Sequence, residues 1–330
     1  MNSTLYVHIG APKTGSTALQ LFFDRNREAL RHRFALYPRA TARAGGHHDI
    51  AFLTGGGYPE WATPQETSLE DLLGELDREL ADHTGDALIS SENFYLFPNP
   101  KSLEDRLLSL PSLKGRRVQV IVYLRPQEEV VEAWYNQTVK AQGSTATFAE
   151  SLERDRDLWD YEARLKPWAD IFGRENIRAR LYGGGSDSTW DICADFVAWF
   201  GISPLGLVFP EVRSNTNLNR DLLEFQRMVN RLPMTPIQKR SLQKQLADLS
   251  LRTRGSGLFC ESSFLSQENR RALRAEYERS NRNVAKDYLD GEELFSPLYD
   301  DAVPHAPYGG LSVETLASLV GWLLIESPQK

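Results

Sequence analysis

Four short apolar runs, separated by longer amphipathic stretches, constrain the fold of this 330-residue chain more than any other feature. Each run has the length of a strand. The third is rich in β-branched residues, which is typical of a strand buried on both faces. Strands that alternate with helices indicate a mostly parallel sheet with helices on both sides. The runs are Leu5–Ile9, Ala87–Ser90, Val118–Leu124 and Ile177–Tyr182.

The segments between these runs have the three- and four-residue apolar spacing of helices. Such spacing follows Thr17, continues from Val130 to Thr138 and recurs over Asp191–Phe200. Beyond Asn219 the strand pattern stops. Helices are predicted there over Asn219–Leu232, Pro236–Leu249 and Ser266–Leu289, followed by a short final helix. We therefore predict an α/β core over residues 1–212 and a helical C-terminal extension over residues 213–330, packed on the core as a single overall domain.

The composition excludes several classes of protein. A hydrophobic fraction of 41% and a charged fraction of 25% are typical of globular proteins, not of disordered or fibrous ones. The 38 Lys and Arg against 45 Asp and Glu leave a net charge of −7, which argues against a protein that coats nucleic acid. An anionic ligand must then be held by a local pocket. No window approaches the roughly 20 apolar residues of a membrane span.

The two cysteines, Cys193 and Cys260, are too few for a disulfide framework and lack the spacing of metal ligands. They fit a reducing compartment. The first residues have neither a positively charged leader nor a long apolar core. We therefore expect a soluble cytoplasmic protein.

The turn from the first predicted strand into the first helix, His8–Gln20, is the most informative segment. A glycine-bearing loop there precedes a helix that opens with Ser16, so backbone N–H groups and the positive end of the helix point at one spot. Such an arrangement suits a phosphate. Gly10 and Gly15 have the separation of a Walker A loop, but Ser16 stands where that motif needs lysine, and Lys13 lies inside the loop. An ordinary tight turn with a surface lysine is the alternative.

The loop Pro12-Lys13-Thr14-Gly15-Ser16-Thr17 resembles the 5′-phosphosulfate loop of sulfotransferases that use 3′-phosphoadenosine 5′-phosphosulfate (PAPS). The longer segment Tyr6–Gln20 resembles bacterial sulfotransferases related to the carbohydrate-modifying (heparan-type) branch. The resemblance implies a P-loop-like three-layer α/β/α fold. It also implies PAPS as cofactor, adenosine 3′,5′-bisphosphate as product and no metal. In that family the loop wraps the 5′-phosphate, and its lysine contacts the oxygen that bridges phosphate and sulfate.

Two candidates for a catalytic base follow from the sequence. Glu92 comes directly after the second predicted strand, where a carboxylate is placed to take a proton. An acid that caps the next helix is an equally plausible interpretation from pattern alone, and the resemblance favours the base. Gly46 precedes the pair His47 and His48, which has no further ligands for a metal site. We choose His48 over His47 as a substrate contact or alternative base.

The third predicted strand ends in Arg125, whose guanidinium can grip a phosphate with two hydrogen bonds. The helix that follows resembles the 3′-phosphate element of the same family, but Ala133 stands where the family has serine. One hydroxyl contact to the 3′-phosphate is therefore in doubt. Without the resemblance, Arg125 is equally plausible as a surface partner of Glu128 or Glu129. Arg282 either reaches the cofactor or substrate or has a structural role in its helix.

These observations predict direct, in-line transfer of a sulfuryl group from PAPS to a hydroxyl, less often an amine, of a saccharide, lipid or small-molecule acceptor. A phosphotransferase that uses ATP and Mg²⁺ is one alternative. Ser16 is available there as a metal ligand, but no aspartate follows a predicted strand. A non-catalytic nucleotide-binding protein is the other.

Overall fold

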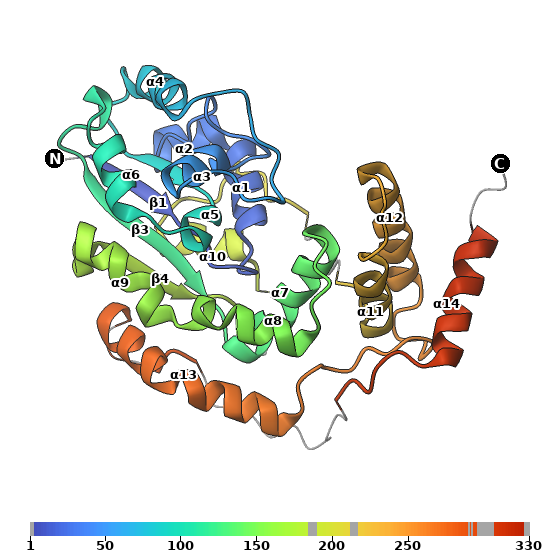
Figure 1. The fold of residues 1–330 in the computed structure, drawn as a ribbon. Helices are drawn as coiled ribbons and strands as arrows, with labels where there is room; N and C mark the ends of the chain where they lie inside the picture. The colour runs from blue at the N-terminus through green and yellow to red at the C-terminus, as the bar shows by residue number, and fades with distance from the viewer. Residues whose placement is uncertain are drawn as a thin grey trace. The chain divides into compact units, whose positions relative to one another are not determined.

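The computed structural model describes residues 3–183, 190–211, 217–289, 291, 293–295 and 307–326. Within them the four predicted strands form one parallel sheet, in the order β2-β1-β3-β4 (Figure 1). All four predicted runs are confirmed to within one residue at each end. The strands are β1 (Thr4–His8), β2 (Ala87–Ser90), β3 (Arg117–Leu124) and β4 (Ile177–Leu181).

Successive residues of these strands enter two different hydrophobic clusters, because side chains along a strand alternate between the faces of the sheet. In β1, Leu5 and Val7 face the larger cluster, whereas Tyr6 packs against the smaller one. In β3, Val120 and Val122 join the larger cluster, and Ile121 lies in the smaller. The sheet is therefore buried on both sides, which explains its near-continuous apolar runs.

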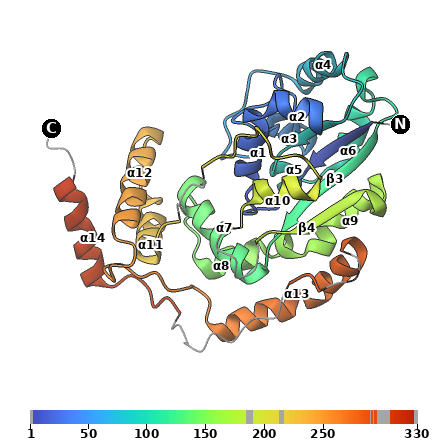
Figure 2. The same ribbon diagram turned by 180° about the vertical axis from the view of Figure 1, so that it is seen from behind.

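Helices cover both faces of the sheet, so the predicted three-layer α/β/α class is confirmed (Figure 2). The larger cluster takes apolar side chains from α3 (His48–Thr54), α4 (Leu69–Leu80), α5 (Asn93–Leu96), α6 (Pro100–Leu107), α9 (Tyr161–Phe172) and the end of α13 (Gln267–Tyr288). The smaller takes them from α1 (Ser16–Arg25), α2 (Arg27–Arg33) and α10 (Ile192–Trp199). Short 3₁₀ turns lie at η1 (Pro111–Leu113), η2 (Arg156–Trp159) and η3 (Arg174–Asn176).

A third cluster holds a separate, helical part of the chain together. Its apolar side chains come from α7 (Gln127–Ala141), α8 (Phe148–Arg154), α11 (Arg220–Val229), α12 (Pro236–Arg252) and α14 (Val313–Glu326). Here Glu132 is buried and accepts hydrogen bonds from Arg220 and Arg270. A buried carboxylate needs such partners, because leaving it unpaired costs several kcal/mol.

The chain divides into two compact units that differ from the predicted division at residue 212. The sheet-containing unit comprises Met1–Arg125, Asp157–Val212 and Glu278–Ser296, and the helical unit comprises Pro126–Arg156, Arg213–Tyr277 and Pro297–Lys330. Residues 126–156 therefore group with the helical unit, although they precede the predicted boundary. The predicted boundary itself lies outside the described residues, and the single-domain arrangement stays a prediction.

The described helices include none with both the length and the apolar content needed to cross a membrane. The longest, α13, runs over Gln267–Tyr288 and is rich in Arg, Glu and Asn.

Phe196 on α10 tests how much the smaller cluster contributes to stability. Its ring is fully buried, with centroids 5.0 Å from Phe23, 5.6 Å from Phe34 and 4.6 Å from Phe200. We expect Phe196→Ala to lower the free energy of unfolding in urea by about 3–5 kcal/mol, because it leaves a cavity. Leu205→Ala, at a side chain that is 80% exposed, should change it by less than about 0.5 kcal/mol. Equal effects would contradict this assignment of the core.

Candidate functional site

The strand order places a candidate site at the carboxyl ends of β1 and β3. In an open parallel sheet, ligands bind outside the carboxyl ends of strands where the order reverses, and in the order 2-1-3-4 this point lies between β1 and β3. The loop after β1 carries Gly10 to Gly15, and Arg125 follows β3 directly. Sheet topology and the loop pattern thus identify the same place independently.

Two glycines let this loop take its path. Gly10 has φ +44°, and a Cβ there would lie 2.4 Å from Ser16 Oγ and 3.3 Å from Glu92 Cα. Gly15, the N-cap of α1, has φ +76°, and its Cβ would lie 3.0 Å from the side chains of Ile192 and Tyr182. Any side chain at either position would force the loop away from the end of β2 or from α10.

The start of α1 offers hydrogen-bond donors that the described residues do not use. The backbone N–H groups of Ala18 and Leu19 donate to Gly15 O, but those of Ser16 and Thr17 have no acceptor in the described part of the chain. Ser16 Oγ is buried, and it too has no hydrogen-bond partner there. Two free amides, a buried hydroxyl and the positive end of a helix match the donors that a phosphate requires.

The other loop residues differ in how far they are exposed to a ligand. Thr14 is fully buried and its hydroxyl donates to Ala11 O at 2.6 Å, so this side chain holds the loop instead of facing a ligand. Pro12 is buried, and Thr17 is exposed at the first turn of α1. The sequence therefore indicated the loop, but it did not show that the Thr14 hydroxyl makes a hydrogen bond within the loop.

Lys13 and Arg125 bring two cations to the loop. Lys13 has φ +59°, a left-handed conformation that costs an L-residue roughly 1–2 kcal/mol. Nη1 of Arg125 lies 3.4 Å from Lys13 O, and its guanidinium carbon lies 5.5 Å from the centre of the Tyr182 ring. The Arg125 backbone oxygen accepts a hydrogen bond from Tyr161 at 2.5 Å, which fixes the chain just after β3.

Glu92 lies beside the loop, and its side chain does not cap a helix. It occupies the N-cap position of α5 but makes no side-chain cap hydrogen bond. Its Oε2 instead accepts a hydrogen bond from Gln20 Nε2 at 3.0 Å and lies 3.8 Å from His48 Nδ1. The side chain is about one-third exposed, so this carboxylate is open to a ligand on one side.

The two neighbouring histidines have different environments. His47 is buried; its Nδ1 accepts the Ser90 N–H at 3.1 Å and its Nε2 lies 3.2 Å from Pro38 O. His48 is partly exposed, and its Nδ1 lies 2.9 Å from Ser91 Oγ and 3.2 Å from Asn93 Nδ2.

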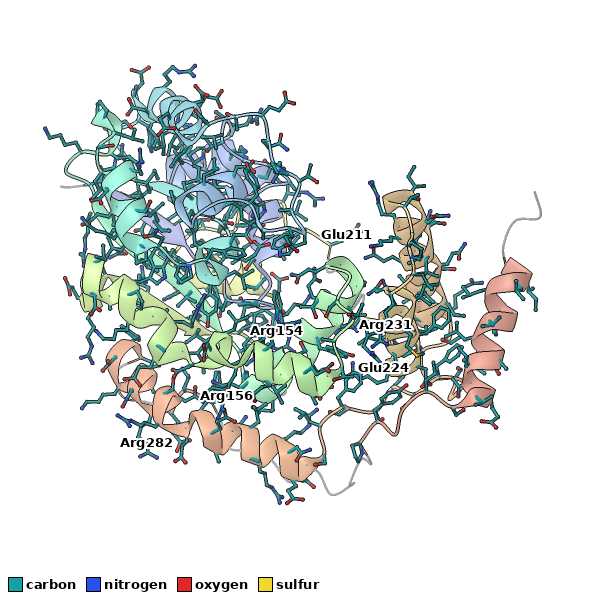
Figure 3. All side chains as sticks on the ribbon, in the orientation of Figure 1. Arg154, Arg156, Glu211, Glu224, Arg231 and Arg282 are labelled. Atoms are coloured by element: carbon teal, nitrogen blue, oxygen red, sulfur yellow. The ribbon has the colours of Figure 1, made fainter. Side chains whose placement is uncertain are left out.

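Ala133 and Arg282 lie on two other helices, and their roles stay predictions. Ala133 belongs to α7 in the helical unit, where it is buried. Arg282 projects from α13 in Figure 3 and pairs with Glu278 one helical turn away at 2.5 Å. Because Arg282 is also 74% exposed, the structure favours its helical role. Glu128, considered as a partner of Arg125, is paired with Arg274.

Sequence reasoning missed Gln20 and Tyr182. Gln20 is 2% exposed and bonded to Glu92, and the Tyr182 ring lies against Gly15 and beneath Arg125. The only sequence feature that could have indicated Gln20 is that a glutamine occupies a buried position of an amphipathic helix. No group of three or more His, Cys, Asp or Glu side chains suited to a metal occurs among the described residues.

The buried histidines predict a pH dependence of stability. Burial lowers the pKa of His47 to about 3 and that of His8, in β1, to about 4, from 6.5. Below pH 6.5 the unfolded chain therefore binds more protons than the folded one, so stability is lost as the pH falls toward these values. We expect His47→Asn, which keeps an acceptor near Nδ1, to reduce the slope of unfolding free energy by about 1.4 kcal/mol per pH unit between pH 6 and 4. Urea unfolding at several pH values measures this slope, and an unchanged slope would contradict it.

Comparison with known proteins identifies solved structures that are similar to this chain. No protein-family model matches the chain, and no curated protein matches it. The chain is similar to a crystal structure of a sulfotransferase from Alicyclobacillus acidocaldarius, with 18% identity and a TM-score of 0.40. The similarity covers 74% of this chain and 91% of that one.

Proposed function

We propose that this protein is a sulfotransferase that moves a sulfuryl group from PAPS to a hydroxyl of its acceptor. The observation that carries the proposal is the donor set at the start of α1, next to Lys13 and with Glu92 beside it. Within the described residues, Ser16 Oγ and the amides of Ser16 and Thr17 have no partner, which suits a phosphate, and a carboxylate suits an acceptor proton. The resemblance of residues 12–17 to a phosphosulfate loop supports the same donor.

The residues of the cradle have separate parts in this proposal. The amides of residues 14–17 and Ser16 Oγ would bind the 5′-phosphate, and Arg125 would contribute a second cation. PAPS would supply the sulfuryl group, with adenosine 3′,5′-bisphosphate leaving as the S–O bond to its phosphate breaks. Lys13 offsets the negative charge that grows on the leaving oxygen, as fixed cationic donors do in such sites. No metal ligand is assigned.

Glu92 is the better candidate for the base. Its carboxylate is partly exposed, and only Oε2 is engaged by described residues. His48, in contrast, has a side chain that is only 14% exposed, and its Nδ1 lies against Ser91 Oγ and Asn93 Nδ2. We assign the acceptor proton to Glu92, while the acceptor oxygen forms its new bond to sulfur. His48 then lies in position to contact the acceptor.

The proposal also covers the class of acceptor and the branch of the sulfotransferase family to which the chain is related. The acceptor is a saccharide, a lipid or a small molecule, and an amine is the less frequent alternative to a hydroxyl. Relation to the bacterial, carbohydrate-modifying (heparan-type) branch rests on the loop resemblance alone. Ala133 would leave one 3′-phosphate contact to another donor. A cytoplasmic location is supported by two free cysteines, of which Cys193 is buried.

Replacing Lys13 separates its charge from its backbone conformation. We expect Lys13→Ala and Lys13→Gly to lower turnover equally, by roughly 10²–10³-fold, because both remove the cation. Lys13→Gly should be more stable than Lys13→Ala by about 1–2 kcal/mol, because glycine adopts φ +59° without strain. Turnover is measured as adenosine 3′,5′-bisphosphate released from PAPS with a panel of hydroxyl- and amine-bearing acceptors.

The exposed Lys114→Ala serves as the matched control and should keep full turnover. Calorimetry tests the donor itself. Tight binding of adenosine 3′,5′-bisphosphate without magnesium supports the proposal, whereas binding of ATP that requires magnesium would replace it with a kinase. Nucleotide binding with no turnover on any acceptor would favour a non-catalytic protein.

Replacing Glu92 tests the assignment of the base. Glu92→Gln should lower turnover by about 10²–10⁴-fold, with the binding of adenosine 3′,5′-bisphosphate unchanged. His48→Asn should have the smaller effect on turnover. Full activity of Glu92→Gln, together with a large loss in His48→Asn, would transfer the role to the histidine.

A further inference from the structure

Gln20 is a buried polar side chain for which the proposed reaction has no role so far. It lies on α1, is 2% exposed, and donates from Nε2 to Glu92 Oε2 at 3.0 Å. The same nitrogen lies 3.4 Å from Ser90 Oγ. Because Nε2 has two hydrogens, one amide group reaches both the end of β2 and the carboxylate that follows it.

The turn before His48 packs against this glutamine. A Cβ at Gly46 would lie 3.0 Å from Gln20 Cδ and 2.6 Å from His48 Nε2. A Cβ at Gly45 would lie 3.5 Å from Gln20 O. Gln20 is therefore held between this turn and β2, and its amide has little freedom to rotate away from Glu92.

The position of Gln20 in α1 links it to the phosphate cradle. Ser16 and Gln20 are four residues apart, so they lie on the same face of the helix, about 6 Å apart along its axis. Ser16 Oγ and Glu92 Cα both lie close to Gly10. Gln20 Nε2 donates a hydrogen bond to the Glu92 carboxylate. One short helix thus carries a donor for the anion and a donor for the candidate base.

We propose that Gln20 is a positioning residue that holds Glu92 Oε2 and leaves Oε1 to take the proton from the acceptor. This inference rests on the proposed function, because it assumes that Glu92 is the base. Glu92 Oε1 has no hydrogen-bond partner among the described residues, whereas Oε2 faces both Gln20 and His48. An N–H that donates to a carboxylate fixes its orientation.

The kinetic test uses Gln20→Met, which keeps the length of the side chain but removes the donor. We expect kcat to fall about 10- to 100-fold, the rate equivalent of one hydrogen bond to a charged group, with KM for PAPS changed less than about twofold. In a Glu92→Gln background the same substitution should cost nothing further, because the group on which it acts is gone. Equal losses in both backgrounds would overturn the proposal.

Two further variants exclude a merely structural effect. Gln20→Glu preserves the shape of the side chain but puts an oxygen against Glu92, so it should lose at least as much kcat as Gln20→Met. Gln226→Met removes a similarly buried amide in the helical unit and should leave kcat unchanged. If Gln20→Glu keeps wild-type kcat, the proposal is wrong.

Crystal structures of the wild type and Gln20→Met decide the point without any assay. We expect the Glu92 carboxylate to contact Gln20 in the wild type and to move in the variant. An unmoved carboxylate would overturn the role of Gln20 whatever the activity. A wild type that neither binds adenosine 3′,5′-bisphosphate nor releases it from PAPS would count against the proposed function alone.

Discussion

The loop after β1 passes so close to the end of β2 that residue 10 has no room for a side chain, and the rest of the site depends on that approach. The space that a Cβ would need at Gly10 holds Ser16 Oγ, and Glu92 Cα lies just beyond it. The same contact buries a hydroxyl at the start of α1 and brings a carboxylate to the edge of the loop. The proposed anion cradle and the candidate base therefore share one packing constraint at Gly10.

In the proposed site, the bound phosphate would lie close to the Glu92 carboxylate, and two negative charges repel each other at short range. The chain as a whole is acidic, so the offset must be local. Lys13 and Arg125 supply positive charge on the side of the loop, and Gln20 and His48 face Glu92 Oε2 on the other side. Lys13 has φ +59°, a conformation that is unfavourable for an L-residue, and the proposed function gives its charge a role at this turn.

The strands and the loop could be predicted from the sequence because their signals are local. A strand buried on both faces is apolar along nearly its whole length, and β3 shows this without a break over residues 120–124. The division between units could not be predicted in the same way. Residues 126–156 adjoin the core in the chain, yet α7 packs with α11 through side chains such as Tyr135 and Leu222. The grouping of α7 with the helical unit depends on contacts between segments that are distant in the sequence, and composition gives no information about such contacts.

The roles of single polar residues were predicted less well, because neighbours in sequence reach different environments. His47 and His48 are adjacent, but α3 begins between them, so one ring lies buried against the Ser90 N–H and the other lies near Glu92. Gln20 is a stronger case. Its partner is 72 residues away, and only the parallel pairing of β1 with β2 brings the two together. Since α1 carries both Ser16 and Gln20, any shift of that helix moves the proposed phosphate donors and the donor to Glu92 together.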